Sequence, residues 1–101
     1  MAYEGASLDA NLAAAAGHDP ELVRELRAAF IESAERQVDL LGRARCDGNW
    51  HVAALRLKGL AASFHAEGLI DLAEEALDGA PGDPAILRRL HQMLADLAID
   101  A

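Results

Sequence analysis

Hydrophobic residues recur along most of this chain at the spacing of one face of an α-helix. The clearest case runs from Trp50 to about His65, where the apolar positions fall on one side of a helix drawn at 100° per residue. This stripe consists of Trp50, Ala53, Ala54, Leu57, Leu60, Ala61 and Phe64. The pattern predicts a central helix with one face in the core.

The opposite face of this helix differs from an ordinary solvated surface. It carries His51, Leu55, Lys58, Gly59 and Ala62. Leu55 places a large aliphatic side chain where water is expected, and several of the residues around it are small. Small residues let another surface come close, and an exposed leucine gives that surface apolar area to bury. This face is therefore a candidate contact surface.

A second strong pattern begins at Asp19-Pro20 and runs to about residues 44–46. An aspartate cap followed by proline is a typical helix start. The predicted inward stripe is Leu22, Leu26, Phe30 with Ala29, Ala34, Val38 and Leu41, widened by Val23, Ile31 and Leu40. At about 26 residues this is the longest predicted helix.

Start and stop signals place three further helices. Ser7 is a predicted cap for a short packing helix over residues 7–16 that stops at Gly17. Asp47 or Asn49 is expected to cap the central helix, and a break is expected near residues 66–68. Two more amphipathic helices follow, one from residue 69 to 79 and one from Asp83-Pro84 to about residue 99. The inward residues expected there are Leu69, Leu72, Ala73, Ala76 and Leu77, then Leu87, Leu90, Leu94 and Leu97 with Ile86 and Met93 alongside.

Short turns between consecutive amphipathic helices predict an all-α fold. The expected architecture is an antiparallel up-and-down four-helix bundle over residues 20–100, preceded by the short helix at 7–16. A chain of 101 residues is expected to be a single domain over 1–101. With 52% hydrophobic but only 4% aromatic residues, its core is predicted to be mostly leucine and alanine.

Charge and cysteine content exclude several functions. The formal charge of −8 argues against binding nucleic acid or anionic lipid. No signal peptide and no apolar run of about 18 residues is apparent, so we expect no membrane span and a cytoplasmic protein. The single Cys46 is too few for an internal disulfide or a zinc site, and we expect no metal and no cofactor. An acidic stripe of Asp71, Glu74, Glu75 and Asp78 is predicted to be a solvated face.

Residues 54–69 resemble the signature of histidine phosphotransfer (Hpt) domains, which reads roughly Ala-His-x-Leu-Lys-Gly-x-Ala/Ser-x-x-x-Gly-Ala-x-x-Leu. The register matches at Ala54, Leu57, Lys58, Gly59, Ala61, Ala66 and Leu69. Leu55 stands at the position of the phosphorylated histidine, and His65 stands at that of the later glycine. The helix pattern of the remaining chain is also similar to that of an Hpt domain.

The resemblance implies a protein of a bacterial-type two-component phosphorelay. In Hpt domains the histidine takes a phosphoryl group from an aspartyl phosphate, the lysine offsets charge on the phosphoryl oxygens, and the glycine lets the receiver domain approach. A leucine side chain cannot accept a phosphoryl group. We therefore predict a binding protein without phosphotransfer activity, whose partner is a response-regulator receiver domain or a histidine kinase. The predicted partner-binding residues are His51, Leu55, Arg56, Lys58, Gly59 and Ala62.

Two alternatives remain open at this point. His51 lies one turn before Leu55 on the same face and could serve as a displaced phosphoacceptor. A one-turn shift of about 5–6 Å is large for phosphoryl transfer, however. Alternatively, the chain is a structural helical module that dimerises through Leu55. We expect a monomer rather than a dimer.

Overall fold

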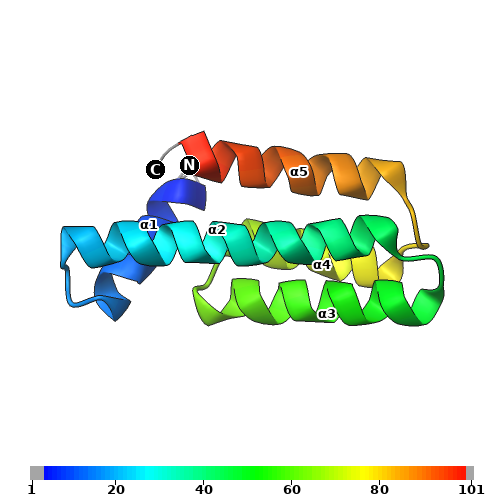
Figure 1. The fold of residues 1–101 in the computed structure, drawn as a ribbon, viewed down its shortest axis with the longest axis horizontal. Coiled ribbons are helices and arrows are strands. Elements are labelled where there is room, and N and C mark those ends of the chain that lie inside the picture. Colours follow the sequence, from blue (N-terminus) through cyan, green and yellow to red (C-terminus); the bar gives the residue numbers. More distant parts are fainter. Residues whose placement is uncertain (1–3, 100–101) are drawn as a thin grey trace.

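The computed structural model of the protein describes residues 4–99, which form helices joined by short turns, with no strand among them. The helices are α1 (Glu4–Ala15), α2 (Pro20–Arg43), α3 (Asp47–Ser63), α4 (Glu67–Asp78) and α5 (Pro84–Ile99) (Figure 1). The predicted all-α fold is confirmed. None of the described helices is long and apolar enough to cross a membrane. Residue 100, the last of the predicted bundle, lies outside the described residues.

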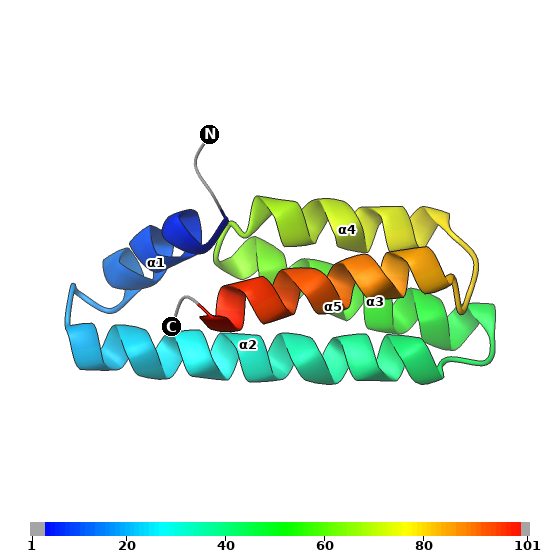
Figure 2. The ribbon, with the colours of Figure 1, turned by 90° about the horizontal axis from the view of Figure 1, so that it is seen from above.

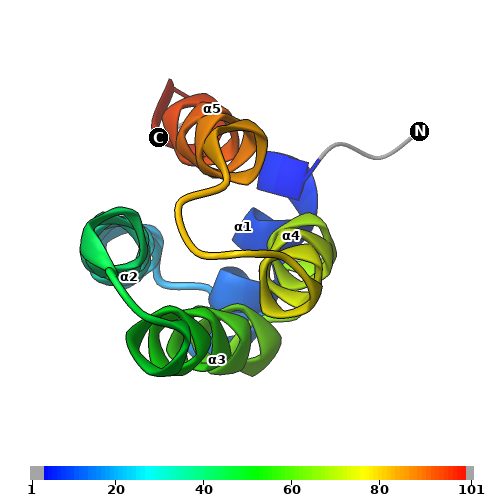
Figure 3. The ribbon, with the colours of Figure 1, turned by 90° about the vertical axis from the view of Figure 1, so that its right-hand side faces the viewer.

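Helices α2 to α5 lie along the long axis of a molecule that measures 42 × 24 × 18 Å. Viewed along that axis, they surround a common core, and α1 lies behind them near one end (Figure 3). Each of the four contacts its neighbours in the order α2, α3, α4, α5 and back to α2, while α1 packs on α2 and α5. The α2–α3 turn and the α4–α5 loop lie at one end of the molecule, and α1 lies toward the other (Figure 2).

The two Asp-Pro sequences begin helices as predicted. The Oδ1 atom of Asp19 accepts hydrogen bonds from the backbone N–H groups of Glu21 at 3.0 Å and Leu22 at 3.5 Å. Asp83 does the same for Ala85 at 2.9 Å and for the following residue at 3.5 Å. In both cases the carboxylate satisfies N–H groups that the first helical turn leaves unpaired.

The core follows the predicted stripes with a few corrections. In α3, the residues Trp50, Ala53, Ala54, Leu57 and Ala61 are buried, and Leu60 and Phe64 are partly buried. In α2, however, Leu22 and Leu40 are 39% and 46% exposed, and Ala29 is exposed. The first turn of α2, which holds Leu22, extends beyond the neighbouring helices (Figure 2). In α5, Ile86 is buried and Leu87 only partly, the reverse of the prediction.

Helix α1 is a packing element, as predicted, but it begins earlier than expected. It starts at Glu4, so Ser7 lies inside the helix and does not stand at its N-cap. Leu8 and Leu12 are fully buried. The helix ends at Ala15, and the chain turns through Gly17, which has a positive φ of 66°.

The predicted caps of α3 are wrong. The helix begins at Asp47 itself, and its N-cap is Cys46, whose side chain makes no capping hydrogen bond. Asp47 therefore lies in the first turn, where its negative charge is favourable beside the N-terminal end of the helix dipole. Asn49 lies further inside the helix.

The break between α3 and α4 occurs slightly earlier than predicted. Helix α3 ends at Ser63, and α4 begins at Glu67. The residue that turns the chain is the exposed His65, with a φ of +54°, while Gly68 lies in the first turn of α4. His65 thus holds a left-handed backbone conformation that favours glycine, at the position where the Hpt signature has glycine.

We expect His65→Gly to raise the free energy of unfolding by about 0.5–1 kcal/mol, because glycine adopts a positive φ without the steric penalty of a Cβ atom. Urea denaturation followed by circular dichroism measures the change. His91→Gly is the matched control, since His91 is exposed inside α5, where glycine should lower stability by about 1 kcal/mol. A loss of stability in His65→Gly would contradict the prediction.

Candidate functional site

The orientation of α3 is fixed by its buried face. Trp50 is 2% exposed, and its Nε1 donates a hydrogen bond of 2.6 Å to the backbone carbonyl of Ala76 in α4. At the other end of the helix, the ring of Phe64 meets the ring of Phe30 edge to face, with centroids 5.6 Å apart. These contacts with α4 and α2 turn the opposite side of α3 toward solvent.

The six predicted partner-binding residues all lie on α3, and most of them are exposed. His51, Leu55, Arg56, Gly59 and Ala62 are exposed, and Lys58 is partly buried. Leu55 is 46% exposed, which is unusual for a leucine in a helix with a buried face. The helix therefore presents these residues together on the outside of the molecule.

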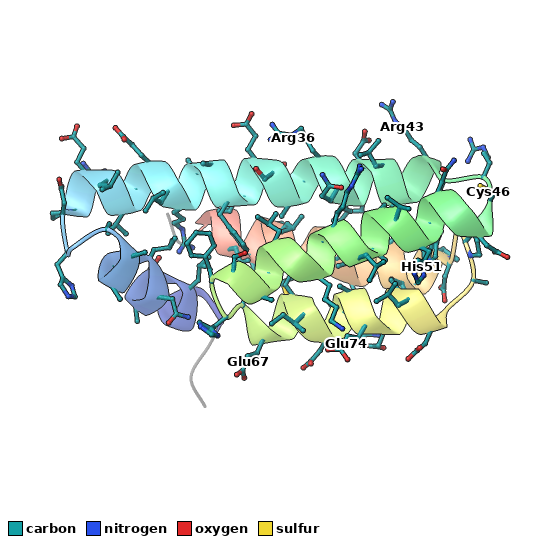
Figure 4. The ribbon with its side chains drawn as sticks, turned by 90° about the horizontal axis from the view of Figure 1, so that it is seen from below. Arg36, Arg43, Cys46, His51, Glu67 and Glu74 are labelled. Carbon is teal, nitrogen blue, oxygen red and sulfur yellow. The ribbon has the colours of Figure 1, made fainter. Side chains whose placement is uncertain are left out.

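Two of the six residues nevertheless border different depressions, and the other four line neither of them. Arg56 lines a groove between α2 and α3, whereas His51 lines a cleft of about 670 Å³ between the start of α3 and the α4–α5 loop. In Figure 4, His51 lies on the side of α3 that faces α4. Asp47 and Asp78 line the same cleft, so His51 shares it with two carboxylates and not with Leu55 or Lys58.

Gly59 has no structural reason to be glycine. It lies inside α3, it is exposed, and a Cβ atom added to it would have no neighbouring heavy atom within 4 Å. Its φ is not positive, so the backbone does not require glycine either. Glycine inside a helix costs about 1 kcal/mol relative to alanine. The chain bears this penalty on the candidate face, beside Leu55.

Sequence reasoning missed one residue of this face and misplaced another. Val52 is 45% exposed, three positions before Leu55, and Leu40 stands exposed on the neighbouring part of α2. The exposed large hydrophobic residues of the described chain are Leu22, Leu40, Val52 and Leu55. A count of apolar residues on the polar side of the predicted helix would have found Val52. The exposure of Leu40 depends on how α2 and α3 pack.

Several cations lie on α3 and near the α2–α3 turn. They are Arg43 at the end of α2, Arg45 in the turn that follows, and Arg56 and Lys58 on α3, which contains no acidic residue after Asp47. Within residues 4–99, only Arg43 of these four forms an ion pair, a 3.2 Å contact from its Nε to Asp39. A chain with a net charge of −8 therefore concentrates positive charge beside its exposed apolar residues.

The acidic stripe of α4 is exposed, as predicted, and one of its members pairs with α5. Glu75 accepts two hydrogen bonds from Arg89, at 2.8 and 2.9 Å. The hydrogen bonds, followed by the charge of Glu75, raise the pKa of Arg89 above its ordinary value. The acidic and cationic surfaces thus lie on different helices.

The described residues contain no group of three or more histidine, cysteine, aspartate or glutamate side chains that could hold a metal ion. The candidate site consists of exposed apolar, small and cationic side chains on α3, and exposed apolar area of this kind is a feature of protein contact surfaces. Comparison with protein-family models, curated proteins and solved structures finds no match to this chain. The resemblance to Hpt domains stays a prediction drawn from residues 54–69.

Proposed function

We propose that this protein is a pseudo-Hpt protein of a two-component phosphorelay, acting in the cytoplasm. In this proposal α2 to α5 form an antiparallel up-and-down bundle, and the exposed face of α3 binds a receiver domain or a histidine kinase without accepting phosphate. Gly59 is the observation that carries the proposal. A glycine that the fold does not need is useful where another surface must approach the helix closely.

The residues around Gly59 fit the same role. Leu55, at the signature position of the nucleophile, is exposed and has no atom that can bond to phosphorus. Lys58 stands at the lysine position of the signature, about one turn after Leu55, where a cation would attract an acidic partner. Docking residues are thus present, and the reacting residue is replaced by one that can be buried in a contact.

The surroundings of His51 do not favour phosphoryl transfer through this residue. Its cleft contains Asp47 and Asp78, and carboxylates repel a phosphoryl group. Lys58, the cation of the signature, does not line that cleft. These observations favour a binding role over the alternative of an active protein with a displaced histidine.

The test uses a receiver domain that carries a labelled aspartyl phosphate. It is mixed separately with the unaltered protein, Leu55→His and His51→Ala, and both binding and label transfer are followed. We expect the unaltered protein to bind without taking label and Leu55→His to gain acid-labile, base-stable label. Transfer by the unaltered protein that is lost in His51→Ala would overturn the proposal. Absence of binding to both receiver and kinase domains would do so as well.

A second prediction separates folding from binding at Gly59. We expect Gly59→Ala to raise the free energy of unfolding by about 1 kcal/mol, since the added methyl group meets no neighbour and alanine favours helix. The same variant should bind the receiver domain more weakly. Denaturation and a binding titration measure the two effects.

Gly42→Ala is the matched control for this prediction. Gly42 lies in the last turn of α2, where a Cβ atom would stand 3.9 Å from the side chain of Leu87 in α5, an ordinary contact. Because the added methyl group would face α5 and not α3, this variant should leave receiver binding unchanged. Equal binding by Gly59→Ala and Gly42→Ala would remove the argument for close approach at Gly59.

A further inference from the structure

A groove between α2 and α3 adds an apolar surface to the candidate face. We name it the α2–α3 groove. Its lining residues are Leu40, Arg43, Ala44, Asn49, Val52, Ala53 and Arg56, and its volume is about 430 Å³. Ala44 and Ala53 are buried and small, while Leu40 and Val52 are each nearly half exposed. The groove therefore has space for an apolar side chain from another protein.

The charged residues of the α2–α3 groove are both cations. Arg56 forms no ion pair with any described residue, and Arg43 makes its single 3.2 Å contact with Asp39 along α2. No carboxylate lines the groove. Because Arg43 comes from α2 and Arg56 from α3, an occupant of the groove would meet a guanidinium group from each helix.

We propose that the α2–α3 groove binds an acidic amphipathic segment of a partner protein. An apolar side chain of that segment lies between Leu40 and Val52 over Ala53, and its neighbouring carboxylates contact Arg43 and Arg56. Charge complementarity argues for this occupant, since opposite charges at an interface rim steer association. A symmetric contact with a second copy would instead place the arginines of both copies together. The inference deepens the proposed function, because the receiver or kinase domain would supply this segment.

The test is an NMR titration of the isotope-labelled full chain with two probes. One probe is the receiver domain, and the other is a synthetic amphipathic helix with a leucine stripe flanked by glutamates. We expect both probes to shift the amide signals of residues 40–44 and 49–56. The same peptide with lysine in place of glutamate should not bind, and added salt should weaken binding of the acidic peptide.

Variants locate the contact. Arg43→Gln and Arg56→Gln should each weaken binding of the acidic peptide by about two- to fivefold. Val52→Ser should weaken it by about tenfold, because the buried apolar area is lost. Arg88→Gln on α5 removes the same charge elsewhere, and Leu22→Ser changes an exposed leucine at the far end of α2. Both control variants should bind as the unaltered protein does.

Each outcome decides between the two proposals. Shifts with the peptide but not with the receiver domain support the groove and count against the receiver as partner. Receiver binding that shifts signals of Lys58 to Ala62 but not those of residues 40–44 and 49–56 overturns the groove and leaves the proposed function standing. Absence of binding by both probes overturns the groove. So does self-association in sedimentation that Val52→Ser abolishes, since the groove would then bind a second copy.

Discussion

Replacing Trp50 with alanine lowers the free energy of unfolding by about 3–5 kcal/mol. The indole is almost completely buried between α3 and α4, and its removal leaves a cavity that a tightly packed core can close only in part. The Nε1 hydrogen bond to the Ala76 carbonyl is lost as well, although that carbonyl keeps a second donor, the N–H of Gly79 at 3.1 Å. The cavity therefore accounts for most of the loss.

Urea denaturation followed by far-ultraviolet circular dichroism measures this loss, since Trp50 is the only tryptophan and its fluorescence disappears with it. Trp50→Phe keeps an aromatic ring and should lose about 1–2 kcal/mol. Small domains have total stabilities of about 5–15 kcal/mol, so the alanine variant is expected to be partly unfolded at mild denaturant concentrations. A loss below about 1 kcal/mol in Trp50→Ala would mean that Trp50 is not a core residue.

Asp9→Ala is expected to lower the free energy of unfolding by about 2–3 kcal/mol, because it leaves the guanidinium of Arg27 buried without its carboxylate. Arg27 is only 3% exposed. Its Nη1 bonds to Asp9 in α1, and its Nη2 bonds to the backbone carbonyl of Leu97 in α5. Since the Asp9 side chain is 48% exposed, water partly compensates the remaining charge, and the loss lies below that of a fully buried pair.

Three further variants serve as controls in the same denaturation experiment. Arg27→Met removes the charge but keeps an apolar side chain of similar length, so we expect a smaller loss than for Asp9→Ala. Adding Asp9→Ala to Arg27→Met should then change stability little, which a double-mutant cycle measures. Glu32→Ala breaks the exposed pair with Arg36 and should cost less than about 0.5 kcal/mol. If Asp9→Ala resembles Glu32→Ala, the buried pair does not hold α1 in place.

The helices could be predicted well because helix caps and hydrophobic stripes depend only on residues close in sequence. An aspartate before a proline caps a helix whatever surrounds it, and the Trp50 stripe follows from helical periodicity alone. Other features depend on neighbours far away in sequence. Arg27 is buried among residues that helical spacing marks as apolar because α1 and the end of α5 pack over it. No single-helix pattern contains that information.

Only part of the candidate site could be predicted, because the rest depends on how distant helices pack. Periodicity placed Leu55, Gly59 and Ala62 on the outside of α3. Helical spacing puts His51 and Arg56 on different flanks of α3, but it could not show which neighbour borders each flank, because that depends on where α4 and α2 lie beside α3. The groove residue Leu40 was assigned to the core, since an apolar residue at the edge of a stripe is buried or exposed according to the distance of the next helix.

The contacts of Arg27 also constrain the order in which the protein can assemble during synthesis. Asp9 leaves the ribosome before Arg27, but the carbonyl of Leu97 follows Arg27 by 70 residues. Domains acquire stable structure only as their contacting segments emerge. We therefore expect α1 to remain loosely attached until the last turn of α5 has emerged from the ribosome. The first helix to be made would then be among the last to be fixed.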